Sequence, residues 1–387
     1  MTRAILYSAV DEVLTSYEID LPSATLARQS SITLPAKVQY VWPHPSLPVL
    51  YVSTSNGGPR VASDFNHLSA LRIGADGALS AWGAPVPLRK RAVHMCVDAG
   101  GRFAINAHNF QKGDLSVHAL AADGSVLAEI PQDPGVDFGA YPHQVMVFPS
   151  GRTALIVDRG NNAQAGKPED PGALRAFDLS DGTVRATQVV APQGGYGFGP
   201  RHIDFHPSQP WVYVADERTN RLYMFRHDAD RLEPEPAFVR DMLERPAEVK
   251  PRQLGGAIHV HPGGGFVYVA NRCDQSVDTP AGKVFAGGEN NIAVYAIDPS
   301  TGEPTLLEHT DTRSFHVRTF SISPCGRLLV TASIKALQRE TASGLEAVPA
   351  ALSVFRIADD GRLAFVRKVD VETPGAQLQY WMGILDA

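Results

Sequence analysis

The chain of 387 residues has little cysteine, no long apolar run and no excess of basic charge. Its three cysteines, Cys96, Cys273 and Cys325, are too few and too scattered for a disulfide framework or a zinc site. They favour reduced thiols and a cytoplasmic location. No apolar run reaches the roughly 18 residues that suggest a membrane span. The N-terminus shows no apolar segment behind a basic start, so we expect no signal peptide.

The charge balance excludes a general nucleic-acid binder. Lysine and arginine number 35 against 41 aspartates and glutamates, which gives a net charge of −6, whereas such binders present a basic surface. The histidines show no close ligand spacing with supporting carboxylates, so we predict no metal site and no cofactor. Hydrophobic residues make up 44%, which is typical of a folded core. The expected partner is a small molecule.

One sequence pattern, here called a phrase, recurs along the chain. It consists of an alternating strand, a short turn and a second alternating strand that ends in small polar residues. It occupies residues 39–56, 93–109, 143–161, 201–217, 258–272 and 317–335. The turn prolines Pro149, Pro207, Pro262 and Pro324 lie 58, 55 and 62 residues apart. Each phrase is typical of a β-hairpin. A third and a weak fourth strand follow most of them, which is the pattern of a propeller blade.

A seventh unit is split between the two ends of the chain. Residues 5–7 and 13–19 resemble the second and third strands of a blade, and residues 378–382 can supply its missing first strand. We therefore predict an all-β fold, a seven-bladed β-propeller of four-stranded antiparallel blades, with residues 1–387 as a single domain and the ring closed by the N- and C-terminal strands. A six-bladed ring and a pair of sandwiches are the alternatives.

Hairpin geometry predicts which residues meet. Residues before a first strand and after a second strand lie on one face of the disc, near its axis, and the Pro/Gly turns lie on the other. The polar residues on the predicted face include His143, Arg159, Arg201, His202, Glu217, His259, Asn271, Arg272, Arg318 and Lys335. Arginines gathered in an acidic protein indicate an anionic ligand. His143 and Glu217 are the candidate acid–base groups. The long connections 161–172, 273–291 and 336–351 are expected on the same face.

At these residues the chain resembles the lactonase family of seven-bladed propellers, which includes 6-phosphogluconolactonases and 3-carboxy-cis,cis-muconate cyclases. The most specific part is Gly199-Pro200-Arg201-His202 with Phe205-His206-Pro207 and Asp216-Glu217. Further matches are Pro142-His143, Ile258-His259, Asn271-Arg272 and Arg318 with Phe320. The resemblance implies a site that makes or breaks lactones, with His143, Arg201, Glu217 and Arg272 as catalytic residues. His202, His259, Arg318, Lys335, Asn271 and Arg159 are the candidate substrate-binding residues.

Three functions remain open from the sequence. The first is hydrolysis of a small anionic lactone, in which His143 or Glu217 activates water and a guanidinium or His202 stabilises the oxyanion. The second is a muconate-type cycloisomerase, which uses the same residues. The third is a propeller that binds a ligand or partner without catalysis. No serine or cysteine has a paired base in these motifs, so no covalent intermediate is expected.

Overall fold

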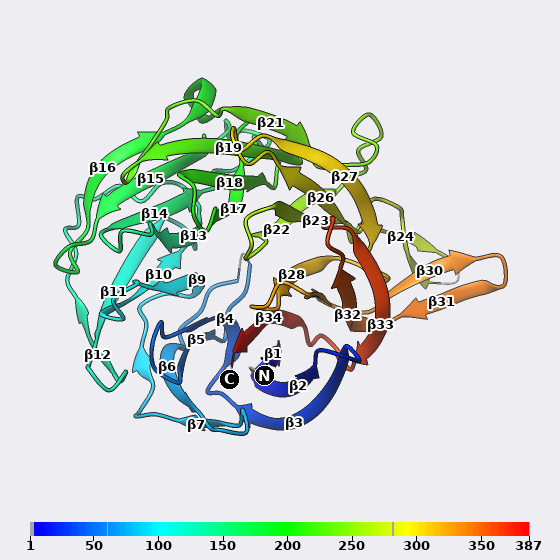
Figure 1. The fold of residues 1–387 in the computed structure, drawn as a ribbon, viewed down its shortest axis with the longest axis horizontal. Helices are drawn as coiled ribbons and strands as arrows, with labels where there is room; N and C mark the ends of the chain where they lie inside the picture. The colour runs from blue at the N-terminus through cyan, green and yellow to red at the C-terminus, as the bar shows by residue number, and fades with distance from the viewer. Residues whose placement is uncertain (1–3, 60, 281, 387) are drawn as a thin grey trace.

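The computed structural model describes residues 4–59, 61–280 and 282–386, which form seven main antiparallel sheets around a central axis (Figure 1). This confirms the predicted seven-bladed propeller. Within these ranges the single helical element is a 3-10 turn at Pro192–Gly195. No helix of the described chain is long and apolar enough to cross a membrane.

The blades follow one another around the ring, and each is described here from its inner to its outer strand. The first three blades are β34 (Gln379–Asp386), β1 (Ala4–Val10), β2 (Val13–Asp20) and β3 (Thr25–Thr33); β4 (Lys37–Pro43), β5 (Val49–Ser55), β6 (Asn66–Ile73), β7 (Leu79–Ala81) and β8 (Val86–Pro87); and β9 (Ala92–Val97), β10 (Phe103–His108), β11 (Asp114–Leu120) and β12 (Val126–Ile130). The fourth and fifth blades are β13 (Pro142–Val147), β14 (Thr153–Asp158), β15 (Ala173–Asp178) and β16 (Arg185–Val190); and β17 (Pro200–Phe205), β18 (Trp211–Asp216), β19 (Arg221–Asp228), β20 (Arg231–Leu232) and β21 (Phe238–Asp241). The sixth and seventh blades are β22 (Leu254–Val260), β23 (Phe266–Arg272), β26 (Asn291–Ile297) and β27 (Pro304–Asp311); and β28 (Val317–Ile322), β29 (Leu328–Ser333), β32 (Ala350–Ile357) and β33 (Leu363–Val371).

The first blade joins the two ends of the chain, as predicted. β34 pairs antiparallel with β1, from Ala4 opposite Asp386 to Val10 opposite Gln379. At the far end of this pair the Asp11 N–H donates to the carbonyl of Leu378, and the Leu378 N–H donates to the side-chain carboxylate of Asp11. The last strand of the chain is therefore the innermost strand of the first blade, and one edge of its backbone faces the axis.

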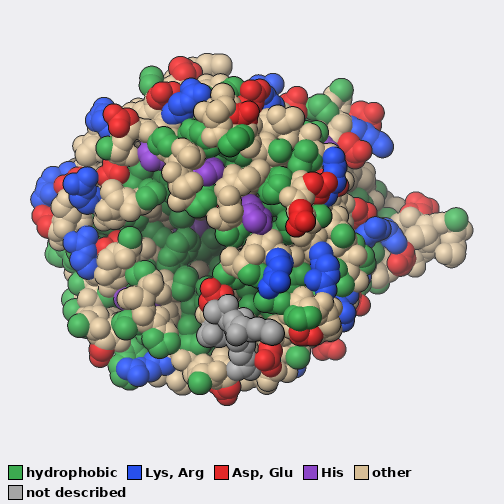
Figure 2. Space-filling view, viewed as in Figure 1, with side chains coloured by type: hydrophobic (Ala, Val, Ile, Leu, Met, Phe, Trp, Pro, Cys, Tyr) green, Lys and Arg blue, Asp and Glu red, His purple; other side chains and the backbone are tan. Residues whose placement is uncertain are grey.

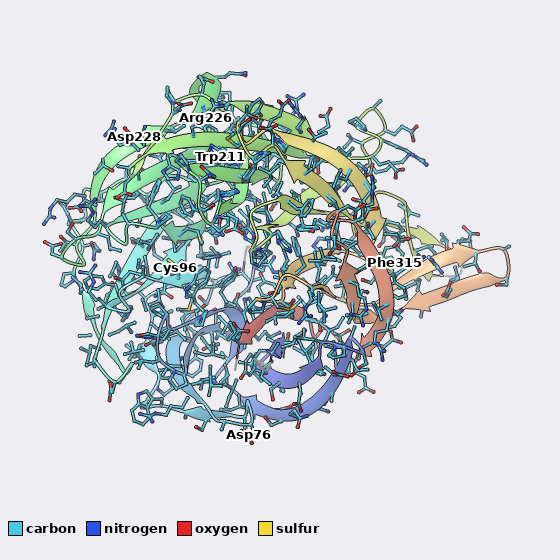
Figure 3. The ribbon with its side chains drawn as sticks, in the orientation of Figure 1. Asp76, Cys96, Trp211, Arg226, Asp228 and Phe315 are labelled. Carbon is cyan, nitrogen blue, oxygen red and sulfur yellow. The ribbon has the colours of Figure 1, made fainter. Side chains whose placement is uncertain are left out.

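Apolar side chains fill the spaces between neighbouring blades (Figure 3). Trp211, for example, is 5% exposed and packs with residues of the sixth blade. Tyrosines of the second strands also tie several blades to the next. Tyr51, Tyr213 and Tyr268 each donate a hydrogen bond to the carbonyl of a turn glycine in the following blade, at 2.8 to 2.9 Å. This packing produces a rigid ring on which residues at the axis are held in place.

Every inner strand carries the same irregularity near its start. The register between the first and second strands of each blade skips a residue there, which is the signature of a β-bulge. The skipped residues are, from the first blade to the seventh, Tyr380, Gln39, Val93, His143, Arg201, the pair 256–257, and Arg318. Bulges redirect side chains, and here they do so at equivalent positions around the axis.

Two of the three long connections form hairpins of their own. Residues 273–291 contain β24 (Ser276–Thr279) and β25 (Gly282–Phe285), and residues 336–351 contain β30 (Leu337–Thr341) and β31 (Gly344–Val348). The rings of Phe285 and Phe315 contact each other at a tilt of 40°, with centroids 4.3 Å apart. Figure 3 labels Phe315 near the base of the β30–β31 hairpin. The β30–β31 hairpin extends outward beyond the rim of the disc, away from the axis (Figure 1).

Candidate functional site

Glu217, directly after β18, lies at the centre of a cluster of arginines from three blades. Arg159 Nη1 donates to its Oε1 at 2.9 Å, and Arg272 Nη2 donates to its Oε2 at 2.9 Å. Nε of Arg201 lies 2.8 Å from the same Oε2 as an ion pair. Glu217, Arg201 and Arg272 are 6%, 1% and 4% exposed, so these charges interact with little screening by water.

The three guanidiniums decide the protonation state of Glu217. Burial alone would raise the pKa of this carboxyl group, but Arg272, Arg159 and Arg201 lower it to about 2. The side chain is therefore a carboxylate that holds the arginines together. A group with so low a pKa is a weak general base at neutral pH.

His143 reaches the axis from the fourth blade, where it is the bulge residue of β13. The turn before the strand is held by Asp158, whose carboxylate accepts hydrogen bonds from the backbone N–H groups of Ala140 and Tyr141. Gly139 has a φ of +89°, and a Cβ there would lie 2.0 Å from an oxygen of Asp158, so only glycine fits. The entry to β13 is thus built to place His143.

His143 is a neutral imidazole at neutral pH. Burial, followed by the charges of Arg201 and Arg159, holds its pKa well below the usual range. Its Nδ1 has no hydrogen-bond partner among the described residues. This nitrogen is enclosed by protein atoms. A neutral imidazole can accept a proton, which makes His143 a candidate base.

His202 lies next to His143, with ring centroids 5.3 Å apart. Nη1 of Arg201 donates to Nδ1 of His202 at 3.1 Å, which assigns the ring proton of neutral His202 to Nε2. His94 of the third blade lies 5.8 Å from His202 and 3.8 Å from Tyr40, measured between ring centroids. These rings form an aromatic layer beside the charged groups, and Nε2–H of His202 is a hydrogen-bond donor within this layer.

Arg272 is oriented by a second set of contacts. Its Nη1 donates to Nε2 of His316 at 2.8 Å, and Nδ1 of His316 lies 3.7 Å from Oδ1 of Asp274. Lys335 Nζ lies 3.1 Å from the other oxygen of Asp274. His316 has a φ of +53°, a strained conformation for this residue type. The contacts of Arg272 with His316, and of His316 with Asp274, hold the guanidinium in the orientation in which its Nη2 donates to Glu217.

Two further arginines have no carboxylate partner within the described chain. Arg91 is 2% exposed, and it donates to Gln39 Oε1 at 2.7 Å and to the hydroxyl of Tyr380 at 3.2 Å. The guanidinium carbon of Arg318 lies 3.8 Å from the centroid of the Tyr380 ring. We call this whole group the axial cluster, and its members are Arg91, His143, Arg159, Arg201, His202, Glu217, Arg272, Arg318 and Tyr380.

Most of the predicted site residues meet in this cluster. His143, Arg201, Glu217, Arg272, Arg159 and His202 are in contact or close to one another, and Arg318 borders them. Lys335 lies one step away, on Asp274. The roles assigned to these residues stay predictions.

Two predicted residues lie elsewhere. Nδ1 of His259 is 3.6 Å from Asp204, near the turn end of the inner strands, because β22 begins at Leu254 and not at residue 258. Its placement on the site face was therefore wrong. Asn271 is fully buried and donates to the carbonyl of Met242 and to Asn291. Side chains alternate along β23, so Asn271 points away from the side on which Arg272 lies.

Arg91, Gln39 and Tyr380 belong to the site but were not predicted from the sequence. The signal was present, because Arg91 and Gln39 stand at the start of predicted first strands and Tyr380 stands in the strand predicted to close the ring. Cys273 follows Arg272, but its thiol contacts the backbone carbonyls of Pro251 and Gly287 and burial raises its pKa. It is not an activated nucleophile.

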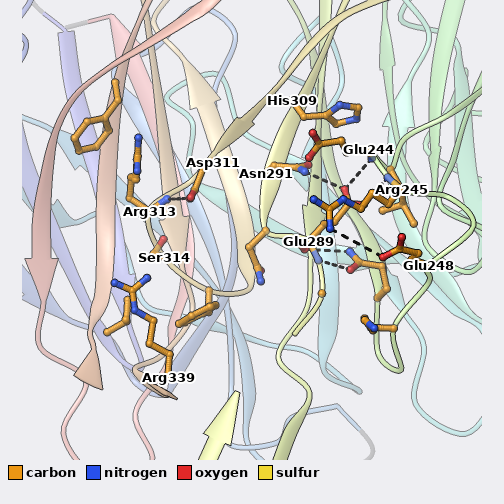
Figure 4. Close-up of a pocket in the computed structure, with 18 of the residues that line it drawn as sticks. Glu244, Arg245, Glu248, Glu289, Asn291, His309, Asp311, Arg313, Ser314 and Arg339 are labelled. Atoms are coloured by element: carbon orange, nitrogen blue, oxygen red, sulfur yellow. Dashed lines mark hydrogen bonds and ion pairs between the residues drawn. The ribbon is translucent and has the colours of Figure 1, made fainter. Parts of the chain in front are cut away.

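A cavity of about 740 Å³ lies away from the axis, beside the seventh blade and its hairpin (Figure 4). Its charged lining is balanced, since Arg245, Lys250, Arg313, Arg339 and Lys368 face Glu244, Glu248, Glu289, Asp311 and Glu346. Such a lining has no preference for an anion. On the face toward which β34 runs, the centre of the disc is hollowed and lined largely by hydrophobic side chains (Figure 2). The excess of positive charge is at the other end of the axis.

The fold and the axial cluster define a lactonase-type propeller. The family described as "Lactonase, 7-bladed beta-propeller" matches residues 7–344, and the chain belongs to it. A 6-phosphogluconolactonase of Bacillus subtilis is 28% identical over 271 residues, which cover 67% of this chain and 70% of the relative. One of Pectobacterium carotovorum is 26% identical over 310 residues, or 79% of this chain and 80% of the relative.

Solved structures show the same fold. The periplasmic gluconolactonase of Pseudomonas aeruginosa has a TM-score of 0.69 at 19% identity, over 97% of this chain and 98% of the other. A protein from Lactobacillus plantarum has a TM-score of 0.72, also at 19% identity, over 99% of both chains.

Proposed function

We propose that this chain hydrolyses a small anionic lactone at the axial cluster. The charge of the cluster carries the proposal, since its members include one carboxylate, that of Glu217, and five guanidiniums. Three of these pair with Glu217, and the other two, those of Arg91 and Arg318, contact Tyr380. The neighbouring imidazoles are neutral. Such a site attracts an anion although the net charge of the chain is −6. The 6-phosphogluconolactonase relatives support the type of reaction.

His143 is the base in this mechanism, and Glu217 is the anchor of the arginines. Water attacks the lactone carbonyl while the imidazole of His143 takes its proton. The oxyanion that forms is stabilised by the N–H groups of Arg201 and by Nε2–H of His202. Arg318, which has no carboxylate partner among the described residues, binds the anionic group of the substrate.

The substrate also strengthens the base. Burial and then the arginines lower the pKa of His143 in the free protein, and a bound anion offsets part of the charge of the arginines. The pKa of His143 then rises toward neutral pH, where a general base works best. An anionic lactone is thus favoured in the chemical step as well as in binding.

The test is a matched pair of lactones, a phosphorylated sugar lactone and its neutral counterpart, with acid release followed at constant pH. We expect the phosphorylated lactone to be turned over faster than the neutral one. We expect His143→Gln to lose this turnover. His259→Gln is the matched control, because His259 lies outside the axial cluster. A carboxymuconate is tested alongside, with its turnover followed by ultraviolet absorbance. If the chain turns over the carboxymuconate and no lactone, it is a cyclase. If it binds the anion and turns over neither, it is a binding protein. The cytoplasmic location and the lack of a nucleic-acid partner stay predictions.

A further inference from the structure

In the first blade Tyr380 occupies the bulge position that His143 and Arg201 occupy in the fourth and fifth blades. In β34, Gln379 pairs with Val10 and Trp381 pairs with Ala9, so Tyr380 is the residue that the register skips. The skipped residues of β13 and β17 are His143 and Arg201. Equivalent bulges therefore direct these three side chains to the same level of the axis. The fourth blade is three blades from the first, so Tyr380 and His143 approach the axis from opposite sides.

The surroundings of the Tyr380 ring are cationic. Arg91 donates to its hydroxyl oxygen, and Arg318 lies against its ring face. Arg91 is itself fixed by Gln39 and Asn109. Neither arginine forms an ion pair with a carboxylate in the described part of the chain, so the charge that each presents to the tyrosine is not cancelled locally.

The hydroxyl of Tyr380 differs from those of three other buried tyrosines. Tyr51, Tyr213 and Tyr268 donate their protons to backbone carbonyls, and burial raises their pKa values. Tyr380 accepts a hydrogen bond and has no acceptor for its own proton among the described residues. Burial acts to raise its pKa, but Arg318 and Arg91 outweigh it and the pKa is lowered. The arginines thus stabilise the phenolate that proton donation would leave.

We propose that Tyr380 is the general acid that protonates the leaving ring oxygen of the lactone. The role rests on the proposed hydrolysis. Water forms the new C–O bond and gives one proton to His143. The ring C–O bond then breaks, and its electron pair stays on the ring oxygen, which takes the phenolic proton of Tyr380. The released acid ionises to a carboxylate, and the proton on His143 returns through water to the phenolate.

Kinetics on the lactone that the wild type hydrolyses test the role. For Tyr380→Phe we expect kcat to fall by about 100- to 10,000-fold, with a small change in KM and with the loss of the alkaline limb of the kcat–pH profile. Tyr213→Phe, which removes a hydroxyl bound to a backbone carbonyl, is the matched control and should retain its kcat. An anionic aryl ester, whose phenolate leaves without a proton, should be hydrolysed by Tyr380→Phe nearly as fast as by the wild type. An equal loss on ester and lactone would mean a structural role and would overturn the proposal.

A second measurement needs no substrate. Alkaline titration of tyrosinate absorbance in the wild type, Tyr380→Phe and Tyr213→Phe should show one ionisation below the ordinary tyrosine pKa, absent only from Tyr380→Phe. If Tyr380→Phe retains it, the assignment of the acid is wrong even where lactone hydrolysis is found. If the wild type hydrolyses no lactone, the proposed function fails and the catalytic role fails with it, whatever the titration shows.

Discussion

Oε2 of Glu217 lies 2.9 Å from Nη2 of Arg272, and both side chains are buried on the axis of the propeller. The same carboxylate also pairs with Arg159 and Arg201. One negative charge thus holds three positive charges from three blades in one place. Glu217→Gln keeps the shape of the side chain and removes the charge. We expect a loss of about 3–5 kcal/mol in the free energy of unfolding, the usual effect of breaking a buried ion pair.

Anions distinguish this anchoring role from a catalytic one. Phosphate added to Glu217→Gln can neutralise the released arginines, so the variant should gain more thermal stability from phosphate than the wild type gains. The melting temperature at rising phosphate concentration, with sodium chloride at matched ionic strength, is the measurement. Equal shifts in both proteins, together with an unchanged melting temperature in buffer, would argue that Glu217 does not hold the arginines.

The pH profile should report the neutral state of His143. Burial and the nearby arginines lower the pKa of His143 well below its ordinary value, and a base is active only while unprotonated. The acid limb of kcat/KM for the anionic lactone should therefore lie below pH ~6.5, the ordinary histidine pKa. Arg318→Gln removes one of the charges that lower this pKa, so its acid limb should move to higher pH. An acid limb at the same pH in both proteins contradicts the assignment of His143 as the base.

The repeat made the fold predictable, because a period of 55 to 62 residues and hairpin turns define blades without any knowledge of packing. The bulges were not predictable. Arg201 and Tyr380 are each the second residue of their strand, so too few residues precede the bulge for a shift in alternation to show, and it is the bulge that sets the direction of these two side chains.

His259 shows the same limit at a strand boundary. Gly255 and Gly256 do not resemble strand residues, yet β22 begins before them at Leu254. The earlier start moves His259 along the axis, to the turn end of the strand. The net charge at the site was also beyond sequence reasoning. Only the packing reveals that three arginines share one carboxylate while Arg91 and Arg318 have no carboxylate partner in the part of the chain that the structure describes.

Arg318 should control the preference for an anionic substrate. Its guanidinium has no carboxylate partner among the described residues, whereas Arg272 is committed to Glu217 and His316. We expect Arg318→Gln to raise KM for the phosphorylated lactone by about tenfold, which is 1.4 kcal/mol, and to leave KM for the neutral lactone nearly unchanged. Higher salt should also weaken the binding of the phosphorylated lactone and so raise its KM. Arg362→Gln, on the exposed rim, is the control for a general loss of charge.

The last strand of the chain should be required both for the ring and for the chemistry. Removal of residues 378–387 deletes the inner strand of the first blade and exposes the edge of β1, an unpaired edge that favours aggregation. We expect the melting temperature to fall sharply, because loss of one inner strand removes several of the ~5–15 kcal/mol that stabilise a typical fold. Replacing the exposed hairpin tip 341–344 by Asn-Gly is the control and should leave the melting temperature unchanged.

Two synthetic peptides then separate the two roles of this strand. A peptide of residues 377–387 added to the truncated protein should restore the melting temperature and the hydrolysis of the anionic lactone, because β34 pairs with β1 along its full length. The same peptide with Tyr380→Phe should restore only the melting temperature, because Gln379 and Trp381 form the ladder while Tyr380 lies outside its register. Equal recovery of activity with both peptides would leave Tyr380 without a part in the reaction, and recovery of neither property would leave β34 unable to bind as a separate strand.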